Sequence, residues 1–134
     1  MIEKVHFQTE VLAIIVRRDF HKEGIHFVTS NDLSQQLAYM SHPTGKEIQP
    51  HVHKKVQREV HFTQETLFIR KGKLKVDFYS VDQEYLESRI LESGDVILLI
   101  KGGHGFEVLE DLEMFEVKQG PYAGDADKIK FTPK

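Results

Sequence analysis

The sequence predicts an all-β fold, and three observations indicate it. Apolar and polar side chains alternate in short runs, most clearly in KLKVDFY at residues 73–79, as expected of a strand with one buried face. Turn residues separate such runs at short intervals, which is typical of a β-sandwich or barrel. No long helical period interrupts the pattern. We therefore expect one β-domain that spans residues 1–134.

Composition narrows the class of protein. The chain has 134 residues, of which 40% are hydrophobic, so it is large enough to bury a core of its own. Its 18 basic and 21 acidic residues are spread along the sequence and give a formal net charge of −3. We see no basic stripe for nucleic acid and no cationic amphipathic helix for a membrane surface. The expected partners are a small molecule and other protein chains.

The sequence also bears on location. It contains no cysteine, so no disulfide framework is expected. The first ten residues, MIEKVHFQTE, carry no apolar signal-like region, and the longest apolar runs, VLAIIV and VILLI, are too short to span a bilayer. We expect a cytoplasmic protein.

The first strand is expected at residues 11–16, VLAIIV, which are apolar on both faces. Such a strand has to be covered on both sides. Two arrangements satisfy this requirement: residues 10–17 lie in a homodimer interface, or the chain's own sheets enclose the strand. Residues 24–29 and 35–41 are expected to form the next two strands.

The stretch of residues 45–72 carries the first candidate site. His51 and His53 follow Pro50 and are two residues apart, so on an extended strand their imidazoles leave the same face. Glu65 opens the next run, ETLFIRKG. This run is expected to end in a turn at Lys71–Gly72 and to return as residues 73–79, which makes a hairpin.

A second candidate stretch follows at residues 94–108. Gly94 and Asp95 are expected to form a turn, residues 96–100 a short buried strand, and the Gly102–Gly103 pair a tight bend just before His104. Residues 113–118 are expected to form the last strand and close the barrel.

Together the two stretches resemble the paired motifs of the cupin superfamily. The residues that carry the resemblance are Gly45, His51, His53, Glu65 and Gly72 in the first motif, and Gly94, Gly102 and His104 in the second. The resemblance implies a small double-stranded β-helix, or jelly-roll barrel, which is often a homodimer. It also implies that His51, His53, Glu65 and His104 bind a metal ion.

The chain departs from the cupin pattern at two points. Eleven residues separate His53 from Glu65, where the family usually has three or four, and Ile100 stands where proline is common. Glu59 and His61 lie inside this longer gap and remain alternatives to Glu65 as ligands. The gap segment, residues 54–64, is a candidate lip over the mouth of the barrel.

Three imidazoles and one carboxylate form a mixed nitrogen and oxygen site that suits Fe, Mn, Ni or Zn. In an octahedral shell, four protein ligands leave two positions open for a small ligand. We expect a metal-dependent enzyme, dioxygenase-like or isomerase-like, that acts on an oxygen-rich molecule such as a sugar or organic acid. The alternative is a non-catalytic module that binds a metal or small ligand, since cupin functions are diverse.

Overall fold

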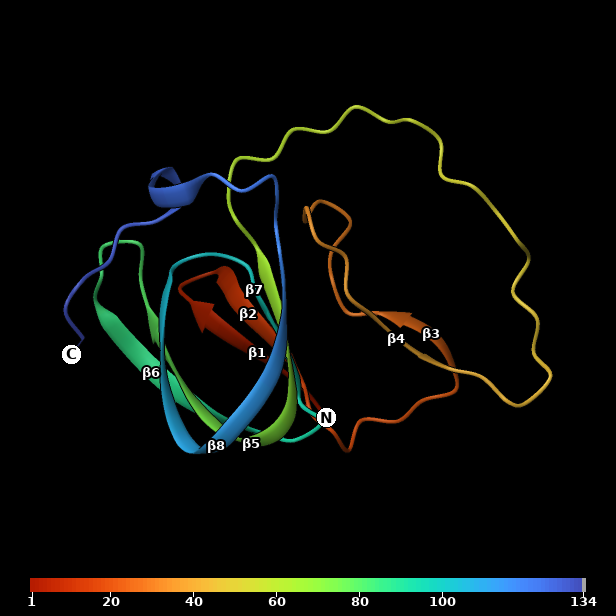
Figure 1. Ribbon diagram of the computed structural model, residues 1–134, viewed down its shortest axis with the longest axis horizontal. Helices are drawn as coiled ribbons and strands as arrows, with labels where there is room; N and C mark the ends of the chain where they lie inside the picture. The colour runs from red at the N-terminus through yellow and green to blue at the C-terminus, as the bar shows by residue number, and fades with distance from the viewer. Residues whose placement is uncertain (134) are drawn as a thin grey trace.

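The computed structural model describes residues 1–133, and strands dominate it, as the sequence predicts (Figure 1). No helix among these residues is long and apolar enough to cross a membrane. The elements are β1 (Ile2–Phe7), β2 (Glu10–Val16), β3 (Gly24–Phe27), β4 (Ala38–Ser41), β5 (Glu65–Tyr79), β6 (Tyr85–Glu92), β7 (Val96–Leu99), β8 (Gly103–Lys118) and the short 3-10 helix η1 (Gly124–Asp127).

Six strands form one antiparallel sheet that curls strongly into a half-barrel (Figure 1). Its strand order is β1-β2-β7-β5-β6, and β8 lies along β5 over nearly the whole length of both strands. Strands β3 and β4 form a separate hairpin. The sheet is therefore curved as a barrel requires, and the double-stranded β-helix expected from the cupin resemblance remains a prediction.

Strand β5 differs from the expected hairpin. It runs without a turn through Lys71 and Gly72, where its pairing with β8 shifts register. On one side of the shift Ile69 is buried, and on the other side Leu74 and Val76 are buried, although these positions have opposite parity. A register shift of this kind, a β-bulge, bends a strand while its apolar side chains stay on the inner face. The glycine that we read as a turn therefore marks a bend within one strand.

The turns expected around the later strands are confirmed. Gly94 adopts a φ of +93°, and Asp95 is buried, where its carboxylate accepts hydrogen bonds from the backbone N–H groups of Arg18 and Glu92. These bonds fix the entry into β7.

Both faces of β2 are covered by the chain itself. Leu12, Ala13 and Ile15 belong to the main core inside the half-barrel. On the opposite face, Ile14 packs with Leu98 and Ile100 of the sheet, and residues 28–37 lie over them through Val28, Leu33 and Leu37. The arrangement in which the chain encloses this strand is thus the one observed, and β2 needs no second subunit to be buried.

The largest departure from expectation is the segment that carries His51 and His53. Residues 43–62, which we call the arm, contain no strand, and all of them are exposed. In Figure 1 the arm is the long yellow loop that arcs away from the half-barrel. The expected strand is absent because a strand is stable only when a neighbour pairs with it, and within residues 1–133 no such neighbour lies beside the arm.

The arm leaves the half-barrel from a fixed root. Gln64 is buried, and its side-chain Oε1 accepts a hydrogen bond of 3.0 Å from the backbone N–H of Gln35. The Gln35 side-chain amide donates to the backbone carbonyl of Gln64 at 3.0 Å and accepts from the hydroxyl of Thr66 at 2.9 Å. The arm therefore extends from an anchored position at the start of β5.

Candidate functional site

Two of the expected metal ligands, Glu65 and His104, meet at one end of the half-barrel. The His104 Nε2 atom lies 3.3 Å from the Glu65 Oε2 atom, and the two side chains are 30% and 14% exposed. Both groups are therefore reachable from solvent but largely removed from it. A carboxylate and an imidazole held in this way form half of the site that the sequence predicts.

The curl of the sheet brings this pair together. In the β5–β8 ladder, Glu65 pairs with Lys118, whereas His104 pairs with Phe78. Glu65 and Phe78 are thirteen positions apart along β5, a distance of about 43 Å on a straight strand. Their side chains meet only because the bulged ladder bends back on itself.

The backbone before His104 is shaped by a glycine. Gly102 has a φ of +78°, and a Cβ atom at this position would lie 2.7 Å from the carbonyl oxygen of Tyr79. Only glycine meets both conditions without strain. The tight bend expected from the sequence is thus confirmed, and it sets the direction in which His104 enters β8. The imidazole then packs against Phe106, with ring centroids 5.3 Å apart.

Electrostatics favour the ionised form of Glu65. The hydrogen bond from His104 is the main cause that lowers the pKa of the Glu65 carboxyl below its ordinary value, and burial opposes it. The charges of His104 and Lys118 lower this pKa further. At neutral pH the site therefore presents a carboxylate, which is the form that binds a metal.

His51 and His53 lie apart from this pair, on the arm. Their rings are neighbours, with centroids 5.3 Å apart, and His51 Nδ1 donates to the carbonyl of Gln49 at 3.0 Å. Both side chains are exposed. The four expected ligands thus form two pairs, and within residues 1–133 no group of three or more His, Asp or Glu side chains is placed to hold a metal ion. The donor chemistry fits a transition metal, but a single chain in this conformation brings together only two of the donors.

The alternative ligands Glu59 and His61 also lie on the arm. They contact each other, with His61 Nε2 3.5 Å from Glu59 Oε2, and both are largely exposed. They share the residue types of the Glu65–His104 pair without its burial. The structure thus brings Glu65, and neither of these two residues, to His104.

The sequence analysis missed the C-terminal residues that surround Glu65. Lys118 lies directly across the ladder from Glu65, and its ammonium approaches Asp127, which also accepts a hydrogen bond from the Thr63 hydroxyl. Farther along, Phe131 packs edge-on against Tyr79, with centroids 5.0 Å apart. The segment that follows β8 therefore packs along this end of the half-barrel. The sequence offered one signal of this contact: Lys118, a basic residue at the end of the last expected strand.

Two hollows on the described surface lie away from the Glu65–His104 pair. One is lined by apolar residues around Ile14, Leu33 and Ile100, and the other by polar residues around Gly72 and Glu110. Neither includes Glu65 or His104, and the two carboxylates in the polar hollow, Glu92 and Glu110, are both paired with Lys73. We give the Glu65–His104 pair more weight because it unites two residues that the sequence singled out.

A comparison of the chain with known protein families, with curated proteins and with solved structures finds no match. The function is therefore inferred from the chemistry of the residues themselves.

Proposed function

We propose that this protein binds one divalent transition metal (Fe, Mn, Ni or Zn) at the end of the half-barrel and acts through it on a small oxygen-rich molecule. The observation that carries this proposal is the Glu65–His104 pair, which is held 3.3 Å apart by the curl of the sheet. His51 and His53 complete the ligand set when the arm approaches this pair.

The residue types support a transition metal more than calcium or magnesium. Calcium and magnesium prefer oxygen ligands, whereas imidazole suits Zn, Ni and Fe and a carboxylate is accepted by all of these ions. Three imidazoles and one carboxylate leave open positions in an octahedral shell, where a sugar or an organic acid can chelate the metal. When bound, the metal supplies Lewis acidity at those positions.

The first test is a calorimetric titration of the metal-free, untagged protein with Zn²⁺, Ni²⁺, Mn²⁺ and anaerobic Fe²⁺. We expect about one ion per chain for at least one of these metals. Glu65→Gln and His104→Ala should each weaken binding at least about tenfold, because each removes a direct ligand and even indirect partners of metal ligands contribute about that much.

The matched control is the exposed pair on the arm. Glu59→Gln and His61→Ala remove the same chemical groups, and we expect binding to change less than about twofold. If no metal binds, the Glu65–His104 pair is an ion pair that stabilises the curl and the proposed function is wrong. If Glu59→Gln and His61→Ala weaken binding as strongly as the changes at Glu65 and His104, the assignment of Glu65 and His104 as the ligands is wrong. If metal binds but no sugar or organic acid binds to the metal-loaded protein, the protein is a metal-binding module.

A further inference from the structure

We propose that the arm of a second copy of this chain pairs with the free edge of β8, closes the half-barrel and brings its His51 and His53 to the Glu65–His104 pair. The complete site would then lie between two chains, each of which supplies half of it. The role given to the histidines rests on the proposed function, whereas the pairing of the arm with β8 does not.

The first observation is an inner wall that lacks its cover. Phe106, Val108 and Met114 of β8 lie directly opposite three fully buried residues of β5: Val76, Leu74 and Ile69. Side chains directly opposite each other in an antiparallel pair lie on the same face of the sheet. Phe106, Val108 and Met114 therefore face the interior, yet they are 41%, 56% and 36% exposed. This pattern indicates a barrel core with one wall missing.

The second observation is the edge of β8 itself. Among residues 1–133, β8 pairs only with β5, so its other edge carries unpaired backbone N–H and C=O groups along 16 residues. Long exposed edges of this kind are ready templates for another strand. The exposed inner face and the free edge belong to the same strand. One added strand would cover that face and pair with the backbone groups of that edge.

The third observation is that the arm carries four exposed apolar residues on one side. Ile48, Val52, Val56 and Val60 recur at every fourth position and are all exposed, and the residues between them are polar or proline. In an extended segment, even-numbered positions share one face, so these four side chains point the same way when the arm is extended. Because water covers all of these residues in the single chain, the arm gains apolar burial only by docking on another surface.

Charge agrees with this pairing. The arm has four basic and two acidic residues, a net charge of +2, whereas β8 has five acidic residues and one basic residue, a net charge of −4. Bases on β5 already contact Glu107, Glu110 and Glu113 of β8, so the attraction is smaller than the formal charges suggest. It favours the approach of the arm and adds little to the final stability.

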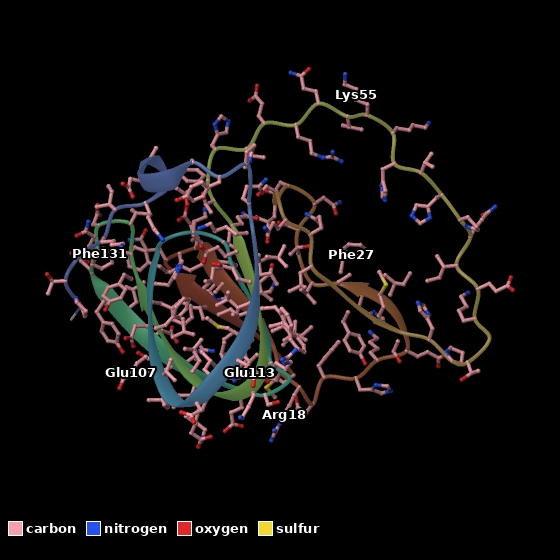
Figure 2. The ribbon with its side chains drawn as sticks, in the orientation of Figure 1. Arg18, Phe27, Lys55, Glu107, Glu113 and Phe131 are labelled. Atoms are coloured by element: carbon pink, nitrogen blue, oxygen red, sulfur yellow. The ribbon has the colours of Figure 1, made fainter. Side chains whose placement is uncertain are left out.

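The geometry of the arm points to a second copy as the occupant. In Figure 1 the β3–β4 hairpin lies between the arm and the strands of its own half-barrel. Figure 2 shows Lys55 on the outer curve of the arm, far from Glu107 and Glu113 on β8 of the same chain. An arm that extends outward from a root anchored at Gln64 can be exchanged reciprocally between two chains about a two-fold axis.

A strand turns only one of its faces inward. The docked arm can therefore direct either its apolar residues or its histidines toward the interior of the barrel, but not both from the same stretch. His51 and His53 lie on the polar face, opposite Val52. When the histidines turn inward, Ile48 and Val52 lie on the outer face of the added strand. The apolar burial of the arm then comes from the residues after His53, which leave the strand and cross the open end of the barrel. Val56, Val60 and Phe62 can then cover that end, as expected for a lip.

The first experiment detects the exchange without any metal. The chain contains no cysteine, so Val52→Cys and Val108→Cys each introduce a single reactive thiol, on the arm and on β8. The two variants carry different tags, are unfolded and refolded together, and are treated with a short bismaleimide reagent. We expect a cross-linked species that contains both tags. Val81→Cys, in the exposed turn before β6, replaces Val108→Cys as the control and should give no such species.

Two results would overturn the exchange. The first is the absence of a cross-link between chains. The second is a cross-link that forms only inside single chains of the double variant V52C/V108C, which would mean that the arm closes on its own barrel.

The second experiment tests whether the site is shared. Chains with H51A and H53A keep Glu65 and His104, whereas chains with E65Q and H104A keep the two arm histidines. Each variant alone should lose tight metal binding. Refolded together, the variants should regain about one ion per mixed dimer, because one of its two sites has all four ligands. A site within one chain would regain none.

The two readouts separate the two proposals. Cross-linking between chains without recovery of metal binding would retain the exchange and reject the shared metal site. Full metal binding by a protein that remains monomeric would retain the proposed function and reject the exchange.

Discussion

Replacing Gly72 by alanine is expected to destabilise the folded protein by about 2–4 kcal/mol. Gly72 lies at the bulge of β5, with a φ of +92°, and a Cβ atom there would lie 2.1 Å from the carbonyl oxygen of Asp111. The left-handed backbone costs about 1 kcal/mol for a residue with a side chain, and relief of a clash with backbone costs typically about 1–3 kcal/mol more. Denaturant unfolding followed by circular dichroism measures this loss.

Gly45 provides the matched control. Its φ is +89°, but no atom lies within 4 Å of the position that a Cβ would occupy. Gly45→Ala therefore tests the backbone cost alone and should destabilise the protein by no more than about 1 kcal/mol. Equal losses at the two positions would show that the close approach of β5 to Asp111 does not hold the bend.

Replacing Val108 by lysine is expected to weaken dimerisation at least about 100-fold and to leave the single chain nearly as stable as before. Val108 faces the interior of the half-barrel but is 56% exposed in one chain, so the unpaired chain tolerates a charge there. In the closed dimer the arm would cover this position. Burying valine is worth about 1.5–3 kcal/mol, and an unpaired ammonium costs more. Light scattering across a concentration series measures the effect.

Val81→Lys is the control for this prediction. Val81 is exposed and lies in the turn before β6, outside the β5–β8 ladder, and its replacement should leave the dimer unchanged. If Val108→Lys dimerises as the parent protein does, β8 is not the surface that the arm covers.

The strands that pair with neighbours close in sequence could be predicted well. The alternation in β5 and β6 and the turn at Gly94 follow from local rules, because the pattern of apolar residues fixes which face is buried and glycine supplies the backbone conformation. The continuity of β5 could not be predicted, since glycine in a strand marks a turn, a bulge or a close approach equally well. The contact between Gly72 and Asp111 decides among them, and it joins residues far apart in sequence.

Half of the candidate site could be predicted for a similar reason. Glu65 opens a strand whose apolar residues are buried in the core, and the Gly102–Gly103 pair sets the bend just before His104, so both positions follow from local patterns. The two-residue spacing of His51 and His53 indicates only that their imidazoles share a face of an extended segment. It does not specify which edge the strand joins or whether that edge belongs to the same chain.

Amide hydrogen exchange across the arm shows whether the arm pairs with β8 of a second chain. Backbone N–H groups of residues 43–62 should exchange rapidly in dilute solution, where single chains dominate, because no strand holds them. Residues 47–53 and the free edge of β8 should become protected together as the protein concentration rises, because pairing between chains forms their hydrogen bonds. Rapid exchange of the arm at every concentration would contradict the account, and so would protection of the arm that is already complete in the monomer.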